Sequence, residues 1–167
     1  MTTVPWKTAL EGQTIAAIEM LENAIRTCPP RIWDDPDTPI ARQFWYLAFH
    51  TLFWFDRYCA TTPEAHVPPA PFTMGELDPS GVYPDRTYTP EELLRYAEYG
   101  RAKCVAFLRA MDEAAAAAPS AVKPEMSAYE FQLYTLRHHA HHVAQLNLIL
   151  RQGGATPVKW VNRRVSG

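Results

Sequence analysis

Four stretches of this chain place apolar residues at intervals of three and four positions, which is the spacing of one face of an α-helix. No stretch shows the strict alternation of a half-buried strand. The predicted helices cover residues 6–27, 39–59, 90–117 and 127–152. Prolines support these limits, because proline ends a helix but is tolerated in its first turn: Pro29 follows the first helix, and Pro39 and Pro90 begin the next two. The pattern predicts an all-α fold, a four-helix bundle.

The predicted helices are joined by two short connections and one long one. The long connection, residues 61–88, is rich in proline. A connection of that length is unusual unless it is functional or crosses the fold. Two arrangements stay open. It runs along the bundle and makes the helices that it joins parallel, which gives an up-down-down-up order, or it packs over one end as a lid. The length of 167 residues predicts a single domain over residues 1–167.

Composition argues against two classes of partner. The net charge is −2, so no basic excess points to nucleic acid. No apolar run approaches the roughly 20 residues that span a bilayer, so no membrane partner is expected. The first residues lack a signal-peptide pattern, and the expected location is cytoplasmic. The three cysteines, Cys28, Cys59 and Cys104, are predicted to be thiols, as in a reducing compartment.

Histidines are concentrated in the last predicted helix, in the run His138-His139-Ala140-His141-His142. His138 and His142 are four positions apart, so their imidazoles share one face of the helix. A helical wheel puts His142 at the centre of the apolar face, with His138 and His139 on either side and His141 toward solvent. Neutral imidazoles in an apolar seam need partners, and a metal ion is one such partner.

A metal site on that face needs a ligand from another helix. His50 lies midway along the second predicted helix, in a strongly aromatic segment, and is the histidine available there. We therefore predict a metal site made of His50, His138 and His142, with at least one open position as in catalytic zinc sites. The alternative is a polar cluster with a purely structural role. The sixth histidine, His66, lies in the long connection and is predicted to be a surface residue rather than a further ligand.

Other candidate functional residues rest on weaker signals. His139 and His141 are weak candidates for proton transfer, and Gln145 is a candidate for a hydrogen bond to one of the ligands. Several aromatic residues are candidates for a pocket lining, although core packing is the favoured interpretation of each: Trp45, Trp54, Phe55, Tyr58 and Tyr134. No Cys-x-x-Cys pair, di-iron Glu-x-x-His motif or glycine-rich phosphate loop is present.

The last helix resembles the signature of the DinB-like superfamily. That signature reads His-x-x-x-His-x-Gly-Gln-Leu with an arginine near the helix end. The chain matches it from His138 to Leu146 and at Arg151, and departs from it only at Ala144, where glycine is usual. His50 corresponds to the family's histidine in helix 2, and the long connection corresponds to the family's crossover. The resemblance covers residues 6–152.

The resemblance implies an up-down-down-up bundle whose three histidines, here His50, His138 and His142, bind zinc, nickel or manganese. Relatives include thiol S-transferases that use bacillithiol or mycothiol and an isomerase that uses mycothiol, so the resemblance makes a low-molecular-weight thiol a candidate cofactor. The leading hypothesis is a metal-dependent enzyme of the thiol S-transferase or hydrolase type that acts on a small molecule. One alternative is a non-catalytic, stress-related bundle that binds a metal or small ligand. Another is a dimeric module that uses the histidines for packing. A homodimer is plausible in each case.

Overall fold

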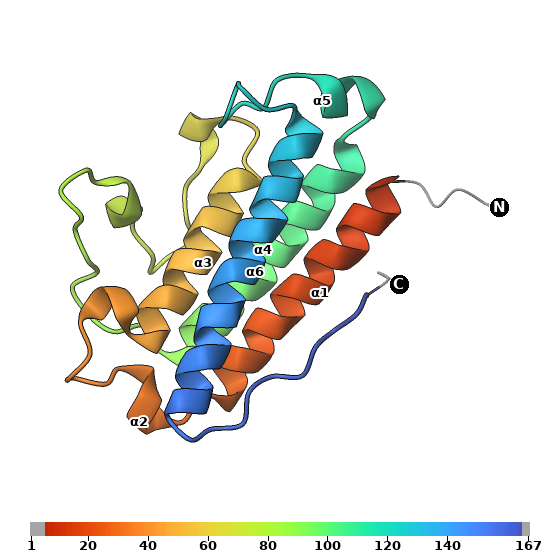
Figure 1. The fold of residues 1–167 in the computed structure, drawn as a ribbon. Coiled ribbons are helices and arrows are strands. Elements are labelled where there is room, and N and C mark those ends of the chain that lie inside the picture. Colours follow the sequence, from red (N-terminus) through yellow and green to blue (C-terminus); the bar gives the residue numbers. More distant parts are fainter. Residues whose placement is uncertain (1–5, 165–167) are drawn as a thin grey trace.

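Four long helices lie side by side in the computed structural model, which describes residues 6–164 (Figure 1). They are α1 (Trp6–Thr27), α3 (Phe44–Tyr58), α4 (Pro90–Ala110) and α6 (Ala128–Gln152). The shorter elements are α2 (Pro30–Trp33), α5 (Glu113–Ala117) and the 3-10 turns η1 (Ile40–Arg42), η2 (Pro63–Ala65) and η3 (Met74–Leu77). No strand occurs in residues 6–164, so the predicted all-α class is confirmed.

The four long helices form a closed ring of neighbours. α1 packs against α4 and α6, and α3 packs against the same two helices, so α1 and α3 lie at opposite corners. In Figure 1, α1 and α6 run toward the end of the bundle that carries α2, whereas α3 and α4 run away from it. Beyond α6, the last described residues run back along α1, where the Arg164 amide donates to the carbonyl of Gly12 over 3.2 Å.

Local side-chain hydrogen bonds define where the last two long helices begin. Thr89 Oγ1 accepts from the Glu92 amide, and the Glu92 carboxylate accepts from the Thr89 amide, which is the capping box that the sequence predicts. Ser127 accepts from the Glu130 amide at the start of α6. These caps satisfy amides that have no partner within their own helix, and so they fix the residue at which each helix begins.

Two predicted helices have different limits in the structure. The second was expected from residue 39 but begins at Phe44, because Gln43 is extended and its side-chain amide donates to the carbonyls of Asp35 and Thr38. The third was expected to continue to residue 117 but ends at Ala110. There Met111 is extended and buried, and Asp112 caps the separate helix α5. Side-chain hydrogen bonds and burial of Met111 outweigh helix propensity at these points.

The long crossover from α3 to α4 runs back along the bundle rather than over its end (Figure 1). Phe72 anchors its middle, since its ring stacks on Phe49 at 5.7 Å and on Tyr96 at 4.4 Å between centroids. Tyr88 anchors its last part, where its carbonyl accepts from the Trp33 indole over 2.9 Å. The crossover is therefore part of the aromatic core around α3.

His66 in this crossover is buried, so its predicted place at the surface is wrong. Only 1% of the residue is exposed, and its ring packs edge-on against Phe53 with centroids 4.8 Å apart. Its Nδ1 lies 3.5 Å from the carboxylate of Asp56, which is itself fully buried and paired with Lys103 and Tyr96. Burial of Asp56 draws the imidazole inward, and nothing in the local sequence around His66 signals that contact.

None of the described helices is long and apolar enough to cross a membrane.

The burial of His66 makes stability depend on pH. Burial lowers the pKa of His66, and the nearby Asp56 only partly opposes this shift. The unfolded chain therefore binds more protons than the folded one as the pH falls below about 6.5, and the free energy of unfolding decreases there. We expect His66→Leu to reduce that dependence by up to about 1.4 kcal/mol per pH unit. Urea unfolding of both proteins at pH 7.5 and 5.5 gives the change in the free energy of unfolding between the two pH values. The same change in the variant as in the wild type would contradict the prediction.

Candidate metal centre

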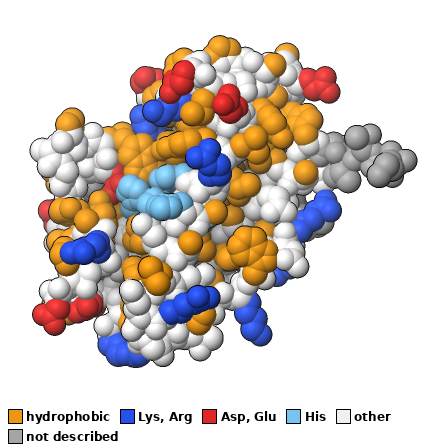
Figure 2. Space-filling view, in the orientation of Figure 1, with side chains coloured by type: hydrophobic (Ala, Val, Ile, Leu, Met, Phe, Trp, Pro, Cys, Tyr) orange, Lys and Arg blue, Asp and Glu red, His pale blue; other side chains and the backbone are white. Residues whose placement is uncertain are grey.

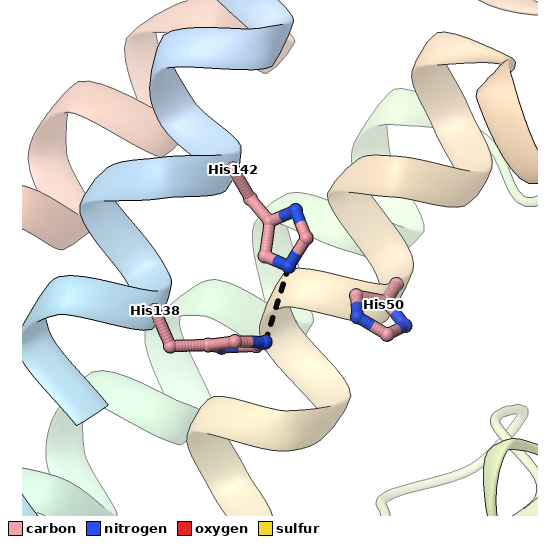
Figure 3. Close-up of side chains that lie close together, drawn as sticks. All are labelled: His50, His138 and His142. Atoms are coloured by element: carbon pink, nitrogen blue, oxygen red, sulfur yellow. Dashed lines mark hydrogen bonds between the residues drawn. The ribbon is translucent and has the colours of Figure 1, made fainter. Parts of the chain in front are cut away.

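Three histidines meet at the seam between α3 and α6. His50 comes from the middle of α3, and His138 and His142 occupy adjacent turns of α6. Figure 3 shows their imidazoles turned toward one another across the seam. One ligand nitrogen from each of the three lies within 4.8 Å of the others. The structure thus brings together the three residues that the sequence singled out.

The two α6 histidines are the closest pair. Their Nε2 atoms lie 3.1 Å apart, and the ring centroids are 4.5 Å apart. The His50 ring centroid lies 4.9 Å from that of His142 and 5.8 Å from that of His138. Each of the three residues is half-buried, and the histidine side chains form one patch on the face shown in Figure 2. The cluster is therefore open to solvent on one side.

Hydrogen bonds to the outer ring nitrogens orient two of these imidazoles. The Nδ1 of His142 lies 2.7 Å from Gln145 Oε1, and the Nδ1 of His50 lies 2.6 Å from Glu76 Oε2. An amide oxygen and a carboxylate accept hydrogen bonds, so both Nδ1 atoms carry the proton and both Nε2 atoms present a lone pair. This is the usual orientation of metal-binding histidines in proteins.

The electrostatics of the cluster favour neutral imidazoles. Burial lowers the pKa of His138 to about 4, and the neighbouring His142 and His50 add to that shift. Burial also lowers the pKa of His142, although Gln145 opposes the change. Since a metal ligand must offer an unprotonated nitrogen, both α6 rings are ready to bind a cation at neutral pH. The donor set fits a divalent ion that accepts imidazole nitrogen.

The comparison with protein families agrees with this geometry. The family model of the DinB superfamily matches residues 13–146. The chain belongs to the DinB superfamily. The matched segment contains all three histidines and Gln145. No curated protein and no solved structure matched the chain.

One prediction about the last helix of this DinB-superfamily protein differs from the structure. The centre of the buried face of α6 is occupied by His139 and Val143 rather than by His142. α6 packs against α1 as well as α3, so its buried arc is wider than the apolar stripe used for the wheel. His138 and His142 therefore lie at the edge of that arc, on the side of α3.

The two weak candidates for proton transfer lie in very different places. His139 is buried, and its Nε2 lies 3.1 Å from the carbonyl of Ala17 on α1. Burial lowers its pKa to about 4, and its ring packs against Phe55, so it faces away from the cluster. His141 is exposed, with its ring centroid 5.2 Å from that of His142. Of the two, only His141 lies beside the cluster.

The aromatic candidates divide into two groups. Trp54, Tyr58 and Tyr134 border the histidines, because Trp54 lies 6.2 Å from His50 and the other two contact His138 at 5.7 and 6.3 Å between centroids. The remaining two, Trp45 and Phe55, are buried in the core, where the sequence favoured placing them. An open pocket on α6 is lined by Tyr134, Arg137, His138, Ala140 and His141.

Glu76, which the crossover brings to His50 in the turn η3, is a site residue that the sequence did not predict. Its carboxylate also accepts from the Tyr46 hydroxyl over 2.5 Å and from the Trp54 indole over 3.0 Å. Burial alone would raise the pKa of Glu76, but the hydrogen bonds from His50 and Tyr46 lower it overall, so it is a carboxylate at neutral pH. No spacing or motif distinguishes Glu76 from the other acidic residues of the chain.

The hydrogen-bond pattern predicts a different tautomer for each α6 ligand without metal. His142 Nδ1 donates to Gln145, so its Nε2 accepts from His138, which must then carry its proton on Nε2. We expect nitrogen NMR of metal-free protein to show Nδ1–H for His50 and His142 but Nε2–H for His138. A divalent metal should move the His138 proton to Nδ1 and leave the other two unchanged. Nε2–H on His142 in the metal-free protein would contradict this assignment.

Proposed function

We propose that this protein binds a divalent metal ion through His50, His138 and His142 and uses it in a transferase or hydrolase reaction on a small molecule. The observation that carries the proposal is the convergence of one ring nitrogen from each of three histidines on two helices, with two of the rings oriented by Gln145 and Glu76. A structural polar cluster does not require three imidazoles with their ring nitrogens this close together. Three imidazoles suit zinc or nickel better than manganese, which prefers oxygen ligands.

We also propose that the four long helices form the up-down-down-up bundle typical of the resemblance. The ring of neighbours and the helix directions in Figure 1 support this order. In it the crossover returns along α3, and α6 lies beside α3 with the opposite direction. That arrangement supports a histidine from α3 facing a pair from α6.

The protein's own residues define what a substrate would meet. A bound divalent ion supplies Lewis acidity, which lowers the pKa of a water or thiol at an open position. His141 and Tyr134 lie on the open side, in the same pocket as His138, where they can contact a substrate or move a proton. Arg137 in that pocket offers a cation to an anionic group. A low-molecular-weight thiol as co-substrate is part of the proposal, on the family resemblance alone.

Metal binding is tested by a matched pair of variants. We expect purified protein loaded with zinc or nickel to hold one ion per chain by elemental analysis. His142→Asn should weaken binding at least about a hundredfold, because removing one of three ligands leaves an incomplete site. His141→Asn is the control, since it removes an exposed neighbour in the same run. Equal metal affinities in the two variants, or no stoichiometric metal in the wild type, would contradict the proposed metal site.

Turnover is tested separately from binding. The zinc-, nickel- and manganese-loaded forms are assayed with bacillithiol, mycothiol, glutathione and coenzyme A against electrophilic acceptors, and with ester and amide substrates for hydrolysis. We expect activity with at least one combination and its loss in His138→Asn. Stoichiometric metal with no turnover in any combination would favour the non-catalytic metal-binding protein instead.

A further inference from the structure

Glu76 connects the crossover to the metal centre through three hydrogen bonds. Its side chain is 4% exposed, and its three donors, Tyr46, His50 and Trp54, occupy every fourth position along α3. Donors at that spacing form one line on the helix surface. The carboxylate therefore lies flat against α3, with Oε1 accepting from Tyr46 and Oε2 accepting from His50 and Trp54.

We propose that Glu76 is a positioning residue that makes metal binding and docking of the crossover depend on each other. This inference rests on the proposed function, because it takes His50 as a metal ligand. Since the Nδ1 of this imidazole is bound to Glu76, its Nε2 is the nitrogen left for a cation shared with His138 and His142. A carboxylate at Nδ1 fixes the ring orientation and makes Nε2 a stronger donor to a cation.

The coupling works in both directions. If docking of Glu76 raises the affinity for a metal by some factor, the metal must stabilise the docked crossover by the same factor. The ion also supplies positive charge beside a buried carboxylate, and a buried charge is costly unless it is compensated. Glu76 in turn offsets part of the charge that three neutral imidazoles leave on a divalent ion.

The crossover is arranged so that this contact matters. Phe72 and Tyr88 anchor it in the aromatic core on either side of Glu76. Residues 78–83 between them are all exposed. Within residues 73–84, Glu76 makes hydrogen bonds to α3, Leu77 adds partial apolar burial, and Tyr83 packs edge-on against Tyr46 with ring centroids 5.1 Å apart. The directional part of this docking therefore comes from the hydrogen bonds of Glu76, one of which is to His50.

Two substitutions separate positioning from charge. In Glu76→Gln the amide oxygen can accept from His50 and Trp54, and the amide nitrogen can donate to the Tyr46 oxygen, so geometry is kept while the charge is lost. Glu76→Ala removes both. Asp78→Ala is the matched control, because Asp78 is exposed and lies two residues away, and its carboxylate accepts from the amide and hydroxyl of Ser80 rather than from α3.

The experiment combines zinc affinity with amide hydrogen exchange in the full chain. Affinity is measured by competition with a chromophoric chelator, and exchange is followed in peptides that cover residues 73–84, with and without zinc. We expect Glu76→Ala to weaken zinc binding about tenfold to a hundredfold, Glu76→Gln to lie between it and the wild type, and Asp78→Ala to match the wild type. Zinc should slow exchange of residues 73–84 about tenfold or more in the wild type, and far less in Glu76→Ala at saturating zinc.

Each other outcome overturns the inference in a recognisable way. Wild-type zinc affinity in Glu76→Ala, with unchanged protection of residues 73–84, removes any positioning role. Zinc binding in the wild type without a change in exchange of residues 73–84 removes the coupling. No zinc binding in the wild type overturns the proposed function and this inference together. Circular dichroism establishes that the alanine variant is folded; if it is not, Glu76→Gln and Asp78→Ala decide the same comparison.

Discussion

The packing of α3 against α6 is the contact on which the candidate site depends. It sets the middle of α3 opposite two adjacent turns of α6, and so it brings one histidine to face a pair. Neither helix holds three converging imidazoles by itself. Because packed helix faces have discrete registers, a shift by one turn on either helix would displace His50 by about 5 Å along the seam relative to the α6 pair. The site is therefore a consequence of bundle register more than of any local motif.

The features that could be predicted from the sequence are those that rest on periodic or local patterns. The apolar spacing gives the long helices, and Thr89 with Glu92 gives the start of α4 correctly because a capping box is complete within four residues. The pair His138 and His142 follows from helical geometry in the same way. His50 was found because few histidines exist and the pair needs a partner on another helix.

Contacts between a loop and a helix could not be predicted from such patterns. Glu76 meets His50 across 26 positions, through a crossover with no repeating pattern. His66 is drawn inward by Asp56, whose burial depends in turn on Lys103 from α4. In each case the partner is chosen by tertiary packing, and a polar residue in a proline-rich segment gives no local sign of it. The prediction that His142 rather than His139 lies at the centre of the buried face of α6 failed for the same reason, since a helical wheel does not show that α6 has two neighbouring helices.

These missed contacts share one physical feature. Both place a crossover side chain that is itself buried, Glu76 at 4% and His66 at 0% exposure, against a polar or charged group of α3, so that side chain would incur a desolvation cost without its partner. Phe72 supplies apolar area between them but little direction, because hydrophobic burial is tolerant of small displacements. The directional hydrogen bonds of Glu76 set the position of the crossover relative to the imidazole of His50. A connection that would otherwise only join two parallel helices thereby becomes part of the environment of the candidate metal centre.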